Sequence, residues 1–244
     1  MHYIICTPSR SRPLPRILAL DIARTLALIC MAIFHFTFDL EMFGYLSWGT
    51  TTVGFWYYFP RMIAGGFLFL AGVSLYLAQG RGVRWGAFAK RFVMIAAAAA
   101  AVTVGTYYYN RQGMILFGIL HCIALSSVIG LLFLRLPVAV VLGVAAALFA
   151  LPWYFQHPAF NATSLLWLGL STEKPWMMDY VPILPWIAPF LAGLAVAKRV
   201  RRWPLIAPSR LVQRLAFPGQ HSLIVYLIHQ PILIGLIWIY AVMV

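Results

Sequence analysis

The sequence predicts an all-α membrane protein, a polytopic bundle of about seven transmembrane helices with its N-terminus in the cytoplasm. Hydrophobic residues make up 63% of the 244 positions and charged residues only 9%. Soluble domains contain about 45–50% apolar and about 25% charged residues, so these few charges cannot cover a soluble surface. The apolar residues also form runs of spanning length, and basic residues alternate between rich and poor connections.

Several apolar runs are long enough to cross a membrane. A spanning helix needs about 20 mostly apolar residues. Seven segments meet this requirement: 17–38, 57–78, 91–109, 114–134, 137–155, 181–198 and 220–241. Pro137 begins the fifth segment, whereas Pro231 interrupts the seventh, where it removes a backbone hydrogen bond and favours a kink.

Residues 1–16 carry Arg10, Arg12 and Arg16 and resemble the basic start of a signal peptide. The apolar run that follows contains Asp21 and Arg24 and has no small-residue cleavage site after it. We therefore expect an uncleaved first span. Residues 1–16 then form a basic cytoplasmic N-terminus, and residues 17–241 form a single transmembrane domain.

The connections between the predicted spans differ in basic residues. Those expected inside carry three arginines in 1–16, four basic residues in 79–91 and six in 198–216. Those expected outside carry none in 39–56, Arg111 near 110, and Lys174 in 156–180. This alternation follows the positive-inside rule. The net charge of +13 therefore indicates topology and attraction to the lipid bilayer, and no nucleic-acid partner is expected.

Several kinds of site are excluded by the residues present. The three cysteines, Cys6, Cys30 and Cys122, form no metal or disulfide pattern. The chain lacks a phosphate-binding P-loop, a Gly-x-Ser-x-Gly elbow and a His-Glu-x-x-His zinc motif. It has only two glutamates, so a carboxylate-rich metal centre is not expected.

Ionisable residues within the first span share one face. At about 100° per residue, Arg24, His35 and Asp39 lie near −60°, −40° and 0° relative to Asp21. Ionisable residues within a span usually have a function, because their burial in hydrocarbon is costly. The common stripe, about 60° wide, therefore predicts a polar passage along this helix.

Two pairs within this stripe have different interpretations. Asp39 is one turn beyond His35, where a carboxylate can orient an imidazole and stabilise its protonated form. Asp21 and Arg24 can instead neutralise each other near the inner interface, with the arginine side chain extending toward water. His35 can also merely bridge two buried helices.

Other spans contribute polar residues to the same region. Individually, these residues have ordinary roles, since arginines anchor helices at the interface and tyrosines line it. Together they predict a polar cavity that opens outward and binds substrate. Its expected members are Arg61, Arg111, His121, Asp179, Tyr226 and His229.

Five stretches of the sequence resemble a known family in the order in which they occur. They are LALDIARTLALICMAIFHFTFDLEMFG, LFLAGVSLYLA, LFGILHCIALSSVIGLLFL, DYVPILPWIAPFLAGLAVA and GQHSLIVYLIHQPIL. They resemble bacterial membrane proteins grouped with the heparan-alpha-glucosaminide N-acetyltransferase catalytic domain, over about residues 16–235. Arg24 and His35, with ten residues between them, also match the Arg-x10-His signature of the wider integral-membrane acyltransferases.

The resemblance implies an acyltransferase in the bacterial cytoplasmic (inner) membrane. The expected co-substrate is acetyl-CoA or another acyl-CoA from the cytosol, without a metal. The expected acceptor is a hydroxyl or amine of a small molecule or glycan at the outer face. A homo-oligomer is compatible with this class.

Roles for individual residues follow from this expectation. Arg24, with Asp21 beside it, is expected to engage a phosphate or carbonyl of the donor. His35 is expected to act as general base, with Asp39 setting its tautomer. His121 is the rival base.

The sequence also departs from the lysosomal members of the family. Their acetyl-handling histidine belongs to a stretch before the second span. The corresponding stretch here retains Trp48, Gly49, Phe59 and Pro60 but has no histidine.

Two other classes of function fit the same polar residues. A small-molecule or ion transporter could use the stripe as its pathway, although such proteins often contain inverted repeats, which are not evident here. A cofactor-binding membrane subunit could hold haem between two of His35, His121 and His229, since membrane cytochromes use such ligands.

Overall fold

The computed structural model describes residues 17–200, 206–207 and 209–243. The predicted basic N-terminus 1–16 and the basic residues Arg201 and Arg202 lie outside the described residues. The described chain contains helices and no strand, which confirms the all-α fold class. Its helices are α1 (Leu18–Met42), α2 (Gly54–Gln79), α3 (Trp85–Tyr109), α4 (Ile119–Phe133), α5 (Val138–Tyr154), α6 (Ile183–Arg199), α7 (Arg210–Gln220) and α8 (Ser222–Met243), with short 3-10 turns at Thr50–Thr52, Pro158–Asn161 and Thr163–Leu168.

The seven predicted spans overlap α1 to α6 and α8. Four of these helices, α1, α2, α3 and α8, are long and apolar enough to cross a membrane, with 25, 26, 25 and 22 residues. α4 and α5 are apolar but shorter, with 15 and 17 residues, and α6 also has 17. The chain is therefore a multi-pass membrane protein that contains both long and short apolar helices.

α7 was not predicted, because it lies within the basic connection 198–216. Its hydropathy is low, so a search for apolar runs does not detect it. Arg210 and Arg214 lie one helical turn apart, and the exposed Leu211 and Leu215 form a neighbouring row. The Ser209 hydroxyl caps the helix by accepting a hydrogen bond from the Val212 N–H at 3.3 Å. This amphipathic pattern is typical of a helix at a membrane surface.

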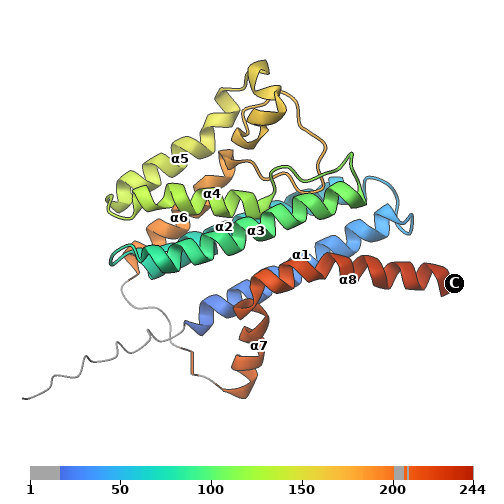
Figure 1. Cartoon of the computed structure of the whole chain (residues 1–244), viewed down its shortest axis with the longest axis horizontal. Helices are drawn as coiled ribbons and strands as arrows, with labels where there is room; N and C mark the ends of the chain where they lie inside the picture. Colours follow the sequence, from blue (N-terminus) through green and yellow to red (C-terminus); the bar gives the residue numbers. More distant parts are fainter. Residues whose placement is uncertain (1–16, 201–205, 208, 244) are drawn as a thin grey trace, which may run out of the picture.

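The core lies where α2 and α6 approach each other closely, together with α4 and α5 (Figure 1). Glycine permits this approach. A Cβ on Gly72 of α2 would lie 1.9 Å from the Phe190 carbonyl oxygen, and one on Gly193 of α6 would lie 2.0 Å from that of Phe69. Small residues allow membrane helices to pack backbone against backbone, and these two glycines do so from opposite sides of one interface.

α1 and α8 form a second layer, in which they run side by side (Figure 1). α7 packs against α1 and leads directly into α8. α1 also contacts α2, so the second layer is joined to the core. The polar stripe of α1 faces these neighbours: Asp21 and Asp39 are each 3% exposed.

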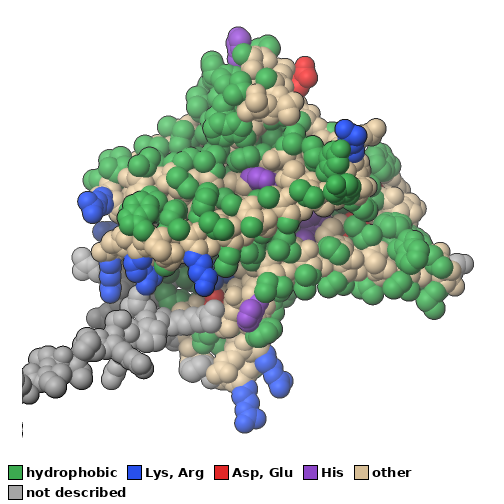
Figure 2. Space-filling view, in the orientation of Figure 1, with side chains coloured by type: hydrophobic (Ala, Val, Ile, Leu, Met, Phe, Trp, Pro, Cys, Tyr) green, Lys and Arg blue, Asp and Glu red, His purple; other side chains and the backbone are tan. Residues whose placement is uncertain are grey.

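The end of the bundle where α2 joins α3 is rich in basic side chains, and we call it the basic end. Lys and Arg gather there in Figure 2, and others surround α7, whereas hydrophobic side chains cover most of the visible face. Lys198, near the end of α6, donates hydrogen bonds there to the carbonyls of Phe133 and Leu134, at 3.1 Å each, and of Leu136. It thus satisfies carbonyl groups at and just beyond the end of α4.

Candidate functional site

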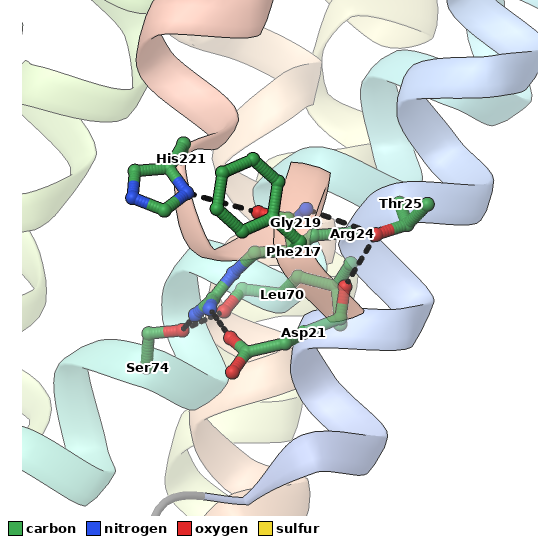
Figure 3. A network of polar contacts seen from close by, with 8 residues as sticks. All are labelled: Asp21, Arg24, Thr25, Leu70, Ser74, Phe217, Gly219 and His221. Carbon is green, nitrogen blue, oxygen red and sulfur yellow. Dashed lines mark hydrogen bonds and ion pairs between the residues drawn. The ribbon is translucent and has the colours of Figure 1, made fainter. Parts of the chain in front are cut away.

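Arg24 links α1 to α2 near the basic end (Figure 3). Its guanidinium donates to Asp21 Oδ1 at 2.8 Å and to Ser74 Oγ at 2.6 Å. Ser74 in turn donates to the Leu70 carbonyl at 2.5 Å. The expected pairing of Asp21 with Arg24 is therefore present, and it includes a serine of α2 that the sequence pattern did not indicate.

The start of α1 is also held by the end of α7 (Figure 3). The Gly219 N–H donates to Thr25 Oγ1 at 2.9 Å, and Thr25 donates to the Asp21 carbonyl at 3.1 Å. A Cβ on Gly219 would lie 1.8 Å from that same carbonyl oxygen. Only glycine permits this contact, so α7 fixes α1 at the level of Asp21.

A pair of imidazoles occupies the interface between α1 and α8. The rings of His35 and His229 contact each other edge to face, with centroids 4.9 Å apart and planes at 62°. His229 Nδ1 lies 2.5 Å from the Tyr226 carbonyl oxygen. A carbonyl only accepts, so Nδ1 carries the hydrogen, and in the neutral ring Nε2 holds a lone pair.

Asp39 contacts α8 rather than His35. Its Oδ1 accepts a hydrogen bond from Gln230 Nε2 at 2.7 Å, and no hydrogen bond joins it to His35. Four buried atoms of this cluster have no hydrogen-bond partner: His35 Nδ1, Asp39 Oδ2, His229 Nε2 and Gln230 Oε1. Buried polar atoms normally have partners, so such a concentration at one interface makes it the candidate site. We call these four residues the histidine cluster.

Asp179 lies at the start of α4, in the connection that precedes α6. Its Oδ2 accepts from the Ile119 N–H at 2.8 Å, and the Tyr226 hydroxyl lies within hydrogen-bonding reach. Burial raises the pKa of Asp179 to about 6, although these hydrogen bonds oppose the shift. The Tyr226 ring also lies 5.6 Å from that of His229, so this side chain connects Asp179 to the histidine cluster.

His121 has contacts for both of its ring nitrogens. Nδ1 accepts from the Gly118 N–H at 3.3 Å, and Nε2 lies 3.3 Å from Thr103 Oγ1. The imidazole therefore caps the start of α4 and joins it to α3. These are contacts typical of a structural histidine.

Arg61 and Arg111 lie apart from the histidine cluster. Arg61 is exposed, stacks on the Tyr57 ring of its own helix with 3.6 Å to the ring centroid, and donates to the Tyr57 carbonyl. Arg111 is also exposed, with its guanidinium 5.1 Å from the centroid of the Tyr107 ring. The structure thus brings His35, Asp39, Tyr226, His229 and Asp179 together, but neither of these arginines.

Sequence reasoning gave no role to three polar residues that have specific contacts in the structure. Ser74 and Gln230 are ordinary polar residues in apolar helices, and only their partners make them notable. Glu41 was also missed: its two oxygens accept from the N–H groups of Gly49 and Thr51 at 2.7 and 2.8 Å. It thereby closes the connection from α1 to α2. No three His, Cys, Asp or Glu side chains within the described ranges are grouped so that they could hold a metal ion.

Comparisons with known proteins identify the family of this chain. The family model described as "Heparan-alpha-glucosaminide N-acetyltransferase, catalytic" matches residues 16–231. Searches of the curated proteins and of the solved structures found no match. The matched region includes every residue of the histidine cluster, and also Arg24 with its partners Asp21 and Ser74. The chain therefore belongs to the heparan-alpha-glucosaminide N-acetyltransferase catalytic family, a family of membrane acetyltransferases.

Proposed function

We propose that this protein transfers an acyl group, most simply acetyl, from cytosolic acyl-CoA to a hydroxyl or amine acceptor at the opposite face of the membrane. The acceptor belongs to a small molecule or a glycan. The membrane is the bacterial cytoplasmic membrane. The observation that carries the proposal is the group of four unpartnered buried polar atoms between α1 and α8.

The histidine cluster has the chemistry that acyl transfer requires. His229 Nε2 accepts the proton of the acceptor's hydroxyl or amine, whose lone pair then attacks the thioester carbonyl. The carbon–sulfur bond breaks, and the thiol leaves with the proton that the imidazole returns. The neutral tautomer suited to this role follows from the contact between His229 Nδ1 and the Tyr226 carbonyl.

His35 is the partner of His229 in this proposal. The rings are in contact, so the two imidazoles act on one proton as a coupled pair. The same contact leaves no room between these two rings for a flat haem, which argues against the haem alternative for this pair. His121 is less suited to proton transfer, because its ring nitrogens already contact Gly118 and Thr103.

Arg24 has the donor-binding role. It lies on the same stripe of α1 as His35, about 16 Å nearer the basic end at about 1.5 Å per residue. Its contacts with Asp21 and Ser74 fix the direction of the guanidinium, and a fixed guanidinium suits a phosphate or carbonyl oxygen.

Turnover of the histidine variants tests the reaction centre. In purified protein supplied with acetyl-CoA and a panel of amine and hydroxyl acceptors, His35→Ala and His229→Ala should each lower turnover about 10²–10⁴-fold, the contribution of a positioned base. Their affinity for CoA should be unchanged. His121→Ala should retain turnover in the fraction that folds. Full activity in His229→Ala, together with its loss in a folded His121→Ala, would assign the base to α4 instead.

The same preparation tests the donor site. The double variant Asp21→Asn/Arg24→Gln removes both charges without leaving either unpaired. Its CoA affinity should weaken by about 1–3 kcal/mol, the scale of a charge-assisted hydrogen bond. Asp21→Asn alone should bind CoA nearly as wild type does. Accumulation of solute in vesicles, without acyl transfer to any acceptor, would favour the transporter alternative.

A further inference from the structure

Arg91 lines a hollow at the basic end that the proposed reaction does not use. The hollow lies between α2, α3 and α4 and has an interior of about 10 Å³, which is room for about one water molecule, so a larger ligand would sit at its open mouth. Its polar lining comes from Arg91, Gln79 and Ser127, and the remaining lining residues are apolar. Phe88 and Phe92 belong to this wall and stack at 6.3 Å between ring centroids.

None of the five acidic side chains is paired with Arg91. Among the described residues it has neither an ion pair nor a hydrogen bond, and Arg24 lies near enough for the two positive charges to repel each other. The sequence has five acidic residues, and each has another location. Asp21 binds Arg24, Asp39 binds Gln230, Glu41 closes the α1–α2 connection, Asp179 lies at the start of α4, and Glu173 is exposed in the distant connection between α5 and α6.

The polar groups around the hollow suit an anion. The guanidinium offers several N–H donors in one plane. Gln79 Oε1 already accepts from the Arg84 N–H at 2.7 Å, which leaves its amide NH₂ as a donor. Ser127 gives its hydrogen to the Ile123 carbonyl at 2.6 Å, so it offers the anion no donor, and the donors come from Arg91 and Gln79. An uncompensated arginine at the edge of hydrocarbon is costly, and an anion from outside the chain removes that cost.

We propose that Arg91 and Gln79 form a binding site for a phosphate ester at the basic end of α2, α3 and α4. A phosphate matches the arginine fork with two oxygens. It also carries enough charge to interact with Arg24 as well. Two sources share this chemistry: the headgroup of an anionic lipid in the adjacent leaflet, and the phosphates of acyl-CoA. Only the second rests on the proposed function.

Binding measurements on the full chain test this site. The protein is placed in phosphatidylcholine nanodiscs, and CoA binding is measured by calorimetry. In a second arm, phosphatidylglycerol is titrated into the phosphatidylcholine and the bound lipid is counted by native mass spectrometry. Arg91→Gln should weaken binding about tenfold or more in one of the two arms, and Arg91→Lys should weaken it less, since lysine retains the charge but not the fork.

Lys90→Gln is the matched control. Lys90 is the exposed neighbour of Arg91, so its replacement changes the net charge equally without touching the hollow. Loss confined to the CoA arm identifies the donor as the ligand, and loss confined to the lipid arm identifies the headgroup. Equal losses in the Lys90 and Arg91 variants, or no loss in either arm, would overturn the site. Because neither arm needs turnover, a protein without acyltransferase activity can still bind the lipid at Arg91.

Discussion

The histidines of α1, α4 and α8 differ in what their ring nitrogens contact. Both nitrogens of His121 lie near polar groups of α3 and α4, whereas His229 Nε2 and His35 Nδ1 are buried without a partner. A lone pair that already caps a helix cannot also take a proton from a substrate. At the residue scale, therefore, the proposed base differs from His121 in having a ring nitrogen without a partner.

Asp179 gives a prediction at the same scale. Its pKa is raised by burial from 3.8 to about 6, so the folded state binds this proton more tightly than the unfolded state does. The contribution of Asp179 to the free energy of unfolding is therefore greatest below about pH 4, decreases as the pH rises to about 6, and is then constant.

Asp179→Asn should remove this dependence, because the amide oxygen can still accept from the Ile119 N–H while carrying no charge. Above pH 6 the variant should be more stable than wild type by about 3 kcal/mol, the free energy that corresponds to the difference between a pKa of 3.8 and one of about 6, and should melt roughly 6–12 °C higher. Below pH 4 the two should coincide. The measurement is the Tm in detergent from pH 4 to pH 8, and a constant difference at every pH would contradict the assignment.

At the element scale, the α2–α6 interface depends on backbone contact. Gly72 and Gly193 each lie against a carbonyl oxygen of the other helix, at distances that no side chain could occupy. The hydrophobic effect contributes little to the association of these helices, since lipid tails are as apolar as leucine. Close packing of complementary surfaces therefore holds the core together.

Gly72→Ala should destabilise the protein by about 1–3 kcal/mol, because the added methyl group must push the Phe190 backbone away. Gly66→Ala is the control on the same helix. A Cβ there meets nothing within 4 Å, so the variant should be neutral or stabilised by up to about 1 kcal/mol through helix propensity. Thermal unfolding in one detergent compares the two, and equal effects would contradict the close contact.

At the scale of the whole molecule, the basic end and the histidine cluster lie at different levels along the helices. The basic residues of the α2–α3 connection, the end of α6 and α7 gather toward one end (Figure 2). The histidine cluster lies further along α1 and α8, beyond the level of Arg24. This arrangement fits an anionic donor that enters from one side and an acceptor that enters from the other.

Accessibility labelling tests this orientation. In a variant without native cysteines, Trp85→Cys and Ser164→Cys each place one thiol at an exposed position in a connection or at a helix end. A membrane-impermeant maleimide added to intact spheroplasts should label position 164 and leave position 85 unlabelled until the membrane is permeabilised. Labelling of both from the same side would contradict the predicted topology.

Much of the candidate site could be predicted because it lies on one helix. The stripe of Asp21, Arg24, His35 and Asp39 follows from 3.6-residue periodicity, and the structure buries the two aspartates of that stripe. The partner of Asp39 could not be predicted this way. Helical spacing favours His35, but the position of α8 gives Asp39 the amide of Gln230 at 2.7 Å.

By itself, the sequence determined that this chain is a multi-pass helical membrane protein and that it resembles its family. Composition, the length of apolar runs and local motifs can all be read from residues that are close in sequence. In addition, a chain of this kind that crosses lipid must satisfy its backbone hydrogen bonds internally, so its spanning segments are helices. Only the tertiary structure decided that His229 meets His35, that α7 docks on α1, and that Arg91 is left without a carboxylate. These depend on which helices lie side by side, and in lipid that choice is made by close fits, such as those at Gly72 and Gly219, that the sequence pattern does not reveal.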